Sequence, residues 1–424
     1  MPTPLFDLLR ASANRQRQRD LPHGECQSSR RDRCTLCFAS RIGYAEELAG
    51  KQKAVAEFWE GFGTGVACGP IITSPEGRQY RTVSKRKAFL RGRNFALGLI
   101  GVDDETDRSF ALDVGSCAIE PASHAHIYAV VQETLQKKEY AALAPEVNYV
   151  IVKGNDREAI VILNLNHFSS ANRREVNNLS KTITHKAKNV TGIHVFVDEQ
   201  RSRYYLSGAP RKDDRTNARP LTKIHGVDGL LHTVGATKFL YSPLSFTQTN
   251  HSILESFTQT AREMLSLIAD DHLYDLYCGY GLFSLTLAQH VRTVTAVEMS
   301  RSSINDGIAN AKRNKAANVR FHSADISAES LVKFLPSDMP ERTRAGMKVL
   351  LDPPRAGVAE GVIDMIGAQR PAKVLHIFCN TGIIGQELKR WKKAGYRPTA
   401  VRPTDMFPGT GEMEMMVLLE PAEK

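Results

Sequence analysis

The feature that most constrains the fold is a regular alternation of apolar runs and helical patterns between residues 272 and 380. Apolar runs of strand length recur at residues 272–279, 291–299, 318–325, 347–354 and 373–380. Helical patterns at 283–290 and 301–315 separate the first three runs. Strands that alternate with helices form a mainly parallel sheet with helices on both faces. We therefore predict a doubly wound α/β domain over residues 236–424.

The chain before residue 236 follows a different pattern. Short strand segments at residues 148–154, 159–167, 192–199 and 203–208 follow one another closely, which is typical of hairpins in a mixed sheet. One helical pattern, at 171–187, interrupts them. We predict a second domain of the α+β class within residues 26–235. Residues 1–25 contain four arginines, and we expect them to form a flexible basic arm.

The charge balance favours a polyanionic partner. The formal net charge is +10, and nucleic acid is the simplest partner for a chain this basic. Residues 81–93, RTVSKRKAFLRGR, carry six basic side chains and no acidic one. Such a run is either a solvated face or a surface that contacts phosphates. No stretch of 18 apolar residues occurs, so we expect no membrane partner and a cytoplasmic location. A monomer is the simplest assembly.

A glycine turn joins the first strand of the alternating region to its helix, in DLYCGYGLFS at residues 275–284. Gly279 and Gly281 let the backbone approach a ligand closely, although the third glycine of a dinucleotide fingerprint is missing. The next two strands end in acids: Glu298, which suits ribose hydroxyls, and Asp325, which suits an adenine edge. Each acid alone could be a helix N-cap. Together with the glycines they favour S-adenosylmethionine as the ligand.

A cysteine, Cys379, ends the last parallel strand at the same predicted edge as Glu298, Asp325 and Asp352. We expect the helix that follows to lower the pKa of its thiol and to favour the thiolate. A thiolate beside a methyl donor suits one reaction. The sulfur adds to carbon 6 of a pyrimidine, carbon 5 takes up the methyl group, and a base removes the proton from carbon 5. The alternative is an inert buried cysteine.

The base is expected in TDMFPGTGEMEMMVLLE, residues 404–420. Glu412 and Glu414 precede an apolar strand there, and the period of two puts both on one face. Glu414 adjoins the strand and should be the better anchored of the two.

In these motifs the chain resembles the RNA 5-methyluridine methyltransferases, most closely the iron–sulfur members that act on 23S ribosomal RNA. The shared motifs are FTQTN (246–250), DLYCGYGLFS (275–284), LDPPRAG (351–357), FCN (378–380) and MFPGTGEMEMMVLL (406–419). The resemblance implies a Rossmann-like methyltransferase domain in which S-adenosylmethionine is contacted by Gln248, Tyr277, Glu298, Asp325 and Asp352. It also implies that Cys379 is the nucleophile and Glu414 the base.

The resemblance further implies that the substrate is a uridine in RNA, with 23S ribosomal RNA first and tRNA as the alternative, bound by the central domain. A rival interpretation is a non-catalytic RNA-binding or assembly factor with a degenerate site, which the intact Cys379 and Glu414 disfavour. One departure concerns the base. The family often has a histidine two residues before the glutamate, where this chain has Glu412. We expect Glu412 either to raise the pKa of Glu414 or to replace it.

The resemblance also accounts for CQSSRRDRCTLC, residues 26–37. Cys26, Cys34 and Cys37 are spaced as in the iron–sulfur segment of the family, and Cys117 matches its fourth cysteine. This implies a 4Fe–4S cluster held by four thiolates. Four cysteines could also bind zinc, so the identity of the metal depends on the resemblance.

Overall fold

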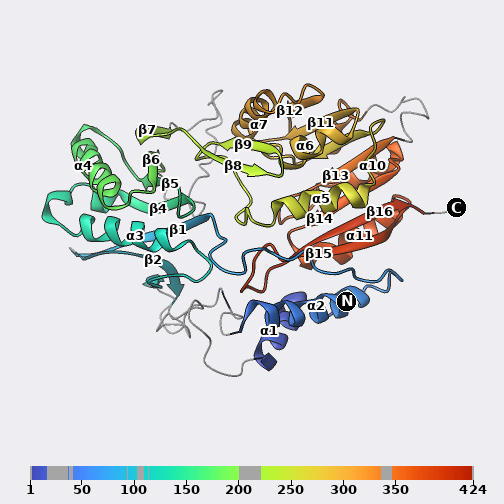
Figure 1. Ribbon diagram of the computed structural model, residues 1–424, viewed down its shortest axis with the longest axis horizontal. Helices are drawn as coiled ribbons and strands as arrows, with labels where there is room; N and C mark the ends of the chain where they lie inside the picture. Colours follow the sequence, from blue (N-terminus) through green and yellow to red (C-terminus); the bar gives the residue numbers. More distant parts are fainter. Residues whose placement is uncertain are drawn as a thin grey trace.

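The computed structural model describes residues 2–16, 37, 42–92, 94–102, 109–112, 114–199, 221–335 and 346–422. These residues form two N-terminal helices, a central sheet and a C-terminal sheet, which Figure 1 shows side by side. The strand predicted at 203–208 lies outside the described residues.

The C-terminal sheet has seven strands in the order β12-β11-β10-β13-β14-β16-β15. Their bounds are β10 (His272–Leu276), β11 (Thr293–Glu298), β12 (Val319–Ser323), β13 (Met347–Leu351), β14 (Lys373–Phe378), β15 (Tyr396–Thr404) and β16 (Glu414–Pro421). Strands β10 to β14 are parallel, and β16 runs antiparallel to β14 and β15. The doubly wound sheet is therefore confirmed. The order reverses between β10 and β13, and ligands bind at the carboxyl ends of strands beside such a switch point.

Helices cover both faces of this sheet. One face carries α5 (Leu254–Leu265), α6 (Leu282–Leu287), the 3-10 turn η3 (Ala288–His290) and α7 (Arg301–Arg313). The other carries α8 (Ala328–Leu331), α10 (Val362–Gln369), the 3-10 turn η4 (Thr381–Ile383) and α11 (Ile384–Lys393). Successive strand residues point to opposite faces, so Leu350 packs under α5 while Val349 and Leu351 face α10.

The two N-terminal helices, α1 (Leu5–Gln16) and α2 (Tyr44–Glu60), belong to the core on the α10–α11 face. The expectation of a flexible arm was wrong for residues 5–16. Leu5 and Leu9 are each 2% exposed and join the same core as Trp391. The apolar stripe of α1 packs against α2 within this core, and its burial outweighs the basic composition. Residues 17–25 lie outside the described residues.

The central sheet has the order β3-β2-β1-β4-β5-β6-β7. Its strands are β1 (Val83–Arg91), β2 (Asn94–Val102), β3 (Ser109–Leu112), β4 (Val147–Gly154), β5 (Ala159–Leu165), β6 (Val190–Val197) and β7 (Leu221–Gly226). Two helices, α3 (Ala122–Leu135) and α4 (Ser170–Lys186), cover one face, and the 3-10 turns η1 (Lys138–Tyr140) and η2 (Ala144–Glu146) follow α3. These elements match the strand-rich pattern expected before residue 236, and the basic run 81–93 contributes β1.

A hairpin of β8 (Leu230–Val234) and β9 (Thr237–Tyr241) connects the two sheets, as Figure 1 shows. Leu230 and Tyr241 pack against the central sheet, whereas Val234 and Phe239 join the core under α5. The boundary expected at residue 235 therefore falls inside an element that both sheets share. Among the described residues, no helix is long and apolar enough to cross a bilayer.

Candidate active site

The strand register brings Cys379 and Glu414 together. Phe378 of β14 pairs with Met415 of β16, so the next positions along the ladder are Cys379 and Glu414. Side chains opposite each other in an antiparallel pair have Cβ atoms roughly 4.5–5.5 Å apart. Electrostatics agree with this placement. Burial is the largest cause of the raised pKa of the Cys379 thiol, Asp352 is the second, and the Glu414 carboxylate is the third.

Two motifs that are distant in sequence are bound to each other at this point. The Cys379 thiol donates a hydrogen bond to the Pro353 carbonyl at 3.5 Å. The Asn380 side chain donates to the Arg355 carbonyl at 2.9 Å. The FCN and LDPPRAG segments therefore form one wall at the carboxyl ends of β13 and β14.

The protonation state of Cys379 differs from our expectation. Burial raises the pKa of its thiol to about 12; Asp352 and Glu414 add to the rise, and Arg355 opposes it. The expected lowering by a helix N-terminus was wrong, because two nearby carboxyl groups and desolvation outweigh the helix dipole. The residues directly after the Asn380 cap form the 3-10 turn η4, and α11 begins only at Ile384. The sulfur is therefore a thiol in this state and must lose its proton before it can attack.

Glu414 is a buried acid with an unused oxygen. It is 3% exposed, and its Oε2 has no hydrogen-bond partner among the described residues. Burial raises its pKa to about 8, with a further rise from Asp352 and a lowering by Arg355. Titratable groups perturbed in this way at a strand edge are typical of functional sites.

Glu412 does not have the effect on Glu414 that we expected. Its carboxylate is half exposed and forms an ion pair with Arg355. The neighbouring acid that raises the pKa of Glu414 is Asp352. The reason is position: Glu412 lies in the turn before β16, whereas Asp352 follows β13 at the centre of the sheet.

A second buried acid, Asp275, was missed in the sequence. It is fully buried in β10, and Ser284 donates to its Oδ2 at 2.5 Å. Burial raises the pKa of Asp275 to about 7. The pKa of Asp352 is also raised to about 7, mainly by burial and to a smaller extent by the Asp275 carboxylate. A charged residue inside an apolar strand was the available signal. The contact also explains why a serine occupies the position of the missing third glycine.

The glycine turn and Glu298 form a second part of the site. The Glu298 carboxylate accepts hydrogen bonds from the Gly279 amide at 3.2 Å and from the Ser300 amide at 2.7 Å. Gly279 has a φ of 54°, and a Cβ on it would meet no atom within 4 Å, so its surroundings are open. Gly281 has another reason to be glycine, because a Cβ there would lie 2.7 Å from the Phe321 ring.

The remaining predicted contacts lie around this turn. Tyr277 adopts a φ of 66°, a left-handed conformation that costs a non-glycine residue on the order of 1–3 kcal/mol. Asp325 is exposed just beyond β12. Gln248 is 8% exposed, and its backbone is hydrogen-bonded to the His251 ring. Two residues later, Asn250 donates to the Met406 carbonyl at 3.2 Å, which joins the FTQTN motif to the turn before β16.

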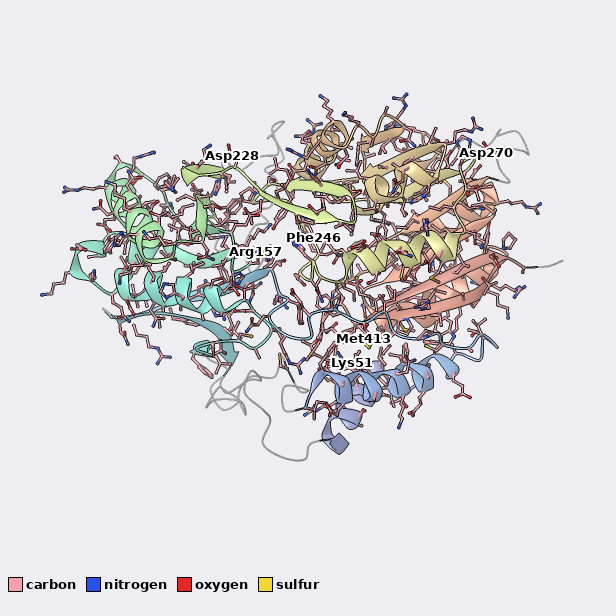
Figure 2. The ribbon with its side chains drawn as sticks, viewed as in Figure 1. Lys51, Arg157, Asp228, Phe246, Asp270 and Met413 are labelled. Carbon is pink, nitrogen blue, oxygen red and sulfur yellow. The ribbon has the colours of Figure 1, made fainter. Side chains whose placement is uncertain are left out.

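An exposed aromatic side chain was also missed. Phe246 opens the FTQTN motif and is 68% exposed, although large apolar residues are usually covered. Figure 2 shows it where the central and C-terminal parts meet. A phenylalanine at the start of a polar motif was the signal in the sequence.

The predicted cysteine ligands are only partly within the described residues. Cys26 and Cys34 lie outside them. Cys37 and Cys117 both lie near residues 79–81: Cys37 adds to the burial-driven rise in the pKa of Tyr80, and the residue after Cys117 pairs with Gln79. Within the ranges that the structure describes, no group of three or more histidine, cysteine or acidic residues could hold a metal.

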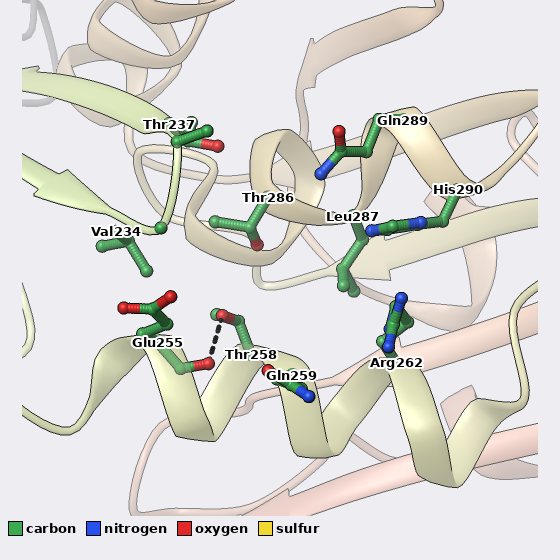
Figure 3. Close-up of a pocket in the computed structure, with 12 residues that line it drawn as sticks. Val234, Thr237, Glu255, Thr258, Gln259, Arg262, Thr286, Leu287, Gln289 and His290 are labelled. Carbon is green, nitrogen blue, oxygen red and sulfur yellow. Dashed lines mark hydrogen bonds between the residues drawn. The ribbon is translucent and has the colours of Figure 1, made fainter.

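A cavity of about 160 Å³ lies elsewhere, between the β8–β9 turn, α5 and α6 (Figure 3). Glu255, Thr258 and Arg262 line one side of it, and Thr286 and His290 line the other. None of the residues predicted to be functional lines this cavity. The candidate site is therefore the carboxyl edge of the sheet.

The strand order and the acids grouped beside its switch point define a Rossmann-like fold of the methyltransferase type. A solved structure with this architecture is the tRNA (uracil-54, C5)-methyltransferase of Pyrococcus abyssi in complex with S-adenosyl-L-homocysteine. The likeness has a TM-score of 0.64 and covers 90% of this chain and 85% of that chain, at 16% identity. A likeness at this identity establishes the fold alone.

The sequence comparisons relate the C-terminal part of the chain to one family of RNA methyltransferases. The family model described as tRNA (Uracil-5-)-methyltransferase matches residues 227–422. The matched residues make up slightly less than half of the chain. It is similar to the 23S rRNA (uracil(1939)-C(5))-methyltransferases of Pectobacterium atrosepticum, at 34% identity over 202 residues, and Aliivibrio salmonicida, at 36% over 190 residues.

The extent of these matches is limited. They cover 48% and 45% of this chain, and the chain spans less than half the length of these curated relatives, 43% and 42%. A longer match, over 398 residues at 27% identity, relates the chain to an uncharacterized RNA methyltransferase of Halalkalibacterium halodurans, with 92% of this chain and 82% of the relative covered.

Proposed function

We propose that this protein methylates carbon 5 of a uridine in RNA, with S-adenosylmethionine as the methyl donor. The observation that carries the proposal is the placement of Cys379 opposite Glu414 at the ends of two adjacent strands. Carbon 5 of uracil becomes a sufficient nucleophile only while a sulfur is bound to carbon 6, so the reaction needs a thiol and a base at one ring. The family match and the named activities of the two relatives support the same reaction.

We assign the two proton transfers of this reaction to two different carboxyl groups, those of Asp352 and Glu414. Of the neighbouring carboxyl groups, Asp352 acts most strongly on the Cys379 sulfur, and we assign it the thiol proton. The sulfur then bonds to carbon 6, the π bond between carbons 5 and 6 breaks, and its electron pair becomes available at carbon 5 to form the new bond to the methyl group. After carbon 5 has been methylated, Glu414 accepts its proton on the unpartnered Oε2. The electrons of that C–H bond restore the double bond between carbons 5 and 6, and the carbon–sulfur bond breaks with its electron pair returning to sulfur.

The site contains groups that suit the methyl donor. The open surroundings of Gly279 give room for a ligand beside the backbone, and the Glu298 carboxylate is held at the edge of that space by the Gly279 amide. We propose that Glu298, Asp325 and Asp352 hold the donor, with Gln248 and Tyr277 as further contacts. When bound, S-adenosylmethionine supplies an electrophilic methyl group.

The RNA is proposed to contact the exposed part of the basic run and Phe246. Lys85 is exposed and Lys87 is half-buried beside the Tyr149 ring, at 4.7 Å from its centroid. Arg86 has a structural role instead, because it is buried and bound to both Glu120 oxygens. Phe246 offers a face on which a base taken out of its stack can lie.

We propose 23S ribosomal RNA as the substrate, because the two similar relatives are named for that activity. A tRNA uridine is the alternative.

We also propose that Cys26, Cys34, Cys37 and Cys117 hold a 4Fe–4S cluster. The placement of Cys37 and Cys117 beside the same segment, residues 79–81, supports this.

The decisive experiment uses RNA that contains 5-fluorouridine. Fluorine at carbon 5 cannot leave as a proton, so the bond between sulfur and carbon 6 should persist. We expect a denaturation-resistant RNA–protein complex that requires S-adenosylmethionine and is abolished by Cys379→Ala. Cys68→Ala, at a half-buried cysteine beside β15, is the matched control and should retain the complex. Separate 23S and tRNA substrates identify the target, and methylation by Cys379→Ala at the normal rate would disprove the mechanism.

A further inference from the structure

We propose that Glu47 and Lys51 of α2 are positioning residues that hold the turn carrying the catalytic base. The base-bearing turn, residues 405–413, connects β15 to β16 and ends directly before Glu414. This inference rests on the proposed function, because it assigns a role to Glu414. Neither α2 residue lies near the turn in sequence, so only the tertiary structure brings them together.

Lys51 anchors the start of the turn. Its ammonium group is 2.8 Å from Asp405 Oδ1 and 2.6 Å from Glu47 Oε1. All three side chains are at most 3% exposed. The Asp405 amide also donates to the Ile72 carbonyl, so the first residue of the turn is held through both its backbone and its side chain.

Glu47 anchors the middle of the turn. Its Oε1 accepts a hydrogen bond from the Gly409 amide at 2.6 Å. Its Oε2 accepts from Arg78 at 3.0 Å, and Arg78 also donates to the Ile42 carbonyl at 3.1 Å. The contact with Gly409 is made to the backbone, so it fixes the path of the turn directly.

Two neutral contacts hold the same turn. The Tyr80 hydroxyl donates to the Pro408 carbonyl at 2.9 Å, and the Asn250 amide donates to the Met406 carbonyl at 3.2 Å. Met413, at the end of the turn, is 2% exposed in the core that α2 helps to form. Figure 2 shows Lys51 and Met413 in the same region, where α2 meets the C-terminal sheet.

The expected free energy of the Glu47–Lys51–Asp405 network favours a role in positioning the base-bearing turn over a role in stabilising the fold. Two buried acids and a lysine gain little stability over apolar residues of similar size, because desolvation offsets most of their attraction. A charged network does specify one geometry, since Lys51 contacts Asp405 Oδ1 and Glu47 Oε1, and both Glu47 oxygens accept hydrogen bonds. The turn carries no helix or strand of its own, so these contacts determine where β16 begins and where the Glu414 carboxyl group lies.

The chemistry provides a readout specific to the base. Glu414 acts after the sulfur has bonded to carbon 6, and product leaves only when the proton on carbon 5 is removed. A displaced Glu414 should therefore let the covalent, methylated adduct form on ordinary uridine RNA and delay its breakdown. A general loss of stability would instead reduce adduct and product together.

We would compare Glu47→Ala, which removes the acceptor for Gly409, with Glu47→Gln, which retains one. Glu47→Ala should accumulate adduct on ordinary RNA and break it down about 10–100-fold more slowly than the unmodified protein, because a misplacement of about 1 Å can have an effect of this size. Glu47→Gln should lie close to the unmodified protein. Tyr80→Phe removes one hydroxyl and should give a smaller delay in a chain that folds normally.

The control is Asp271→Asn. Asp271 is 2% exposed at the opposite, amino edge of the sheet, where it accepts from the Ile268 amide at 2.9 Å. It should lower stability without accumulating adduct. Normal adduct breakdown in Glu47→Ala and Tyr80→Phe, or equal delays in Glu47→Ala and Asp271→Asn, would overturn the proposal.

Hydrogen exchange separates this inference from the proposed function. Amides in the base-bearing turn should exchange faster in Glu47→Ala than in Asp271→Asn, whether or not the protein methylates RNA. If the unmodified protein gives neither adduct nor product, the proposed function fails, and exchange still decides whether Glu47 holds the turn. Unchanged exchange at the Gly409 amide would overturn the anchoring.

Discussion

At the scale of single residues, buried carboxyl groups dominate the candidate site. Burial raises the pKa of Asp275 and Asp352 to about 7 and that of Glu414 to about 8, and each acid also feels a neighbouring carboxylate. The same burial keeps Cys379 protonated. The site therefore holds protons near neutral pH that it must exchange during a reaction, and its activity should depend strongly on pH.

Glu414 should impose opposite pH trends on activity and stability. A base must be unprotonated, so the rate of adduct breakdown should rise with pH up to about 8. The folded state binds a proton that the unfolded state releases above its usual pKa of 4.5, so this group's contribution to the free energy of unfolding falls as pH rises between 4.5 and about 8. One such group gives a slope of at most about 1.4 kcal/mol per pH unit.

Urea unfolding at several pH values measures this trend. Glu414→Gln should flatten the loss of stability between pH 5 and 8 by up to about 1.4 kcal/mol per pH unit. Glu412→Gln, which removes the charge of a half-exposed residue in the same turn, is the matched comparison. Identical slopes for Glu414→Gln and the unmodified protein would show that Glu414 titrates normally.

At the scale of elements, the packing of α1 and α2 against the C-terminal sheet separates this molecule from a simple two-domain arrangement. Both helices belong to the core on the face that also carries α10 and α11. The charged side chains of Lys51 and Glu47 in α2 contact the base-bearing turn. Segment 68–72 pairs in parallel with β15 through Cys68 and Ile72, so the edge of the sheet is covered as well. The N-terminal part of the chain thus contacts both the edge of the C-terminal sheet and the turn that precedes Glu414.

Leu9→Ala should test whether α1 belongs to the core. Leu9 is 2% exposed, and truncation of a buried leucine costs about 2–5 kcal/mol. The measurement is the free energy of urea unfolding. Arg10→Ala, at an exposed position on the same helix, should change it by less than about 0.5 kcal/mol. An equally small effect of Leu9→Ala would mean that residues 5–16 do not contribute to the fold.

At the scale of the whole molecule, Cys37, Cys117 and contacts of the C-terminal part meet near residues 79–81. Gln79 and Arg81 pair with the segment after Cys117, and Tyr80 contacts the base-bearing turn through Pro408. A cluster bound beside this segment would lie close to the turn, residues 405–413, that precedes Glu414. It would also join the N-terminal part, through Cys37, to the central part, through Cys117.

Protein purified without oxygen should contain about four iron atoms and matching acid-labile sulfide. Cys37→Ser and Cys117→Ser should each lower the iron content, while Cys68→Ser should not. Metal analysis measures the iron content of each variant, and the visible absorption spectrum shows whether the cluster is present. One zinc atom in a colourless protein would replace the cluster with a zinc site.

Some properties of this protein follow from sequence alone. The alternation of apolar runs and helices determined a parallel sheet, and the carboxyl ends of parallel strands share one edge. Cys379, Glu298 and Asp352 had to lie on that edge because each follows or ends such a strand. Glu414 was predictable as the better anchored acid for a similar reason, since it begins the strand that pairs with β14.

Other properties were decided only by the tertiary structure. The protonation of Cys379 depends on burial and on carboxylates from two other segments, and a local pattern contains neither. Glu412 pairs with Arg355, a partner 57 residues away, and the apolar side of α1 is covered by α2. The periodicity of apolar residues in the sequence indicates only which side of a helix or strand is apolar. Electrostatic energies and packing depend on distances between groups that only the folded chain brings together.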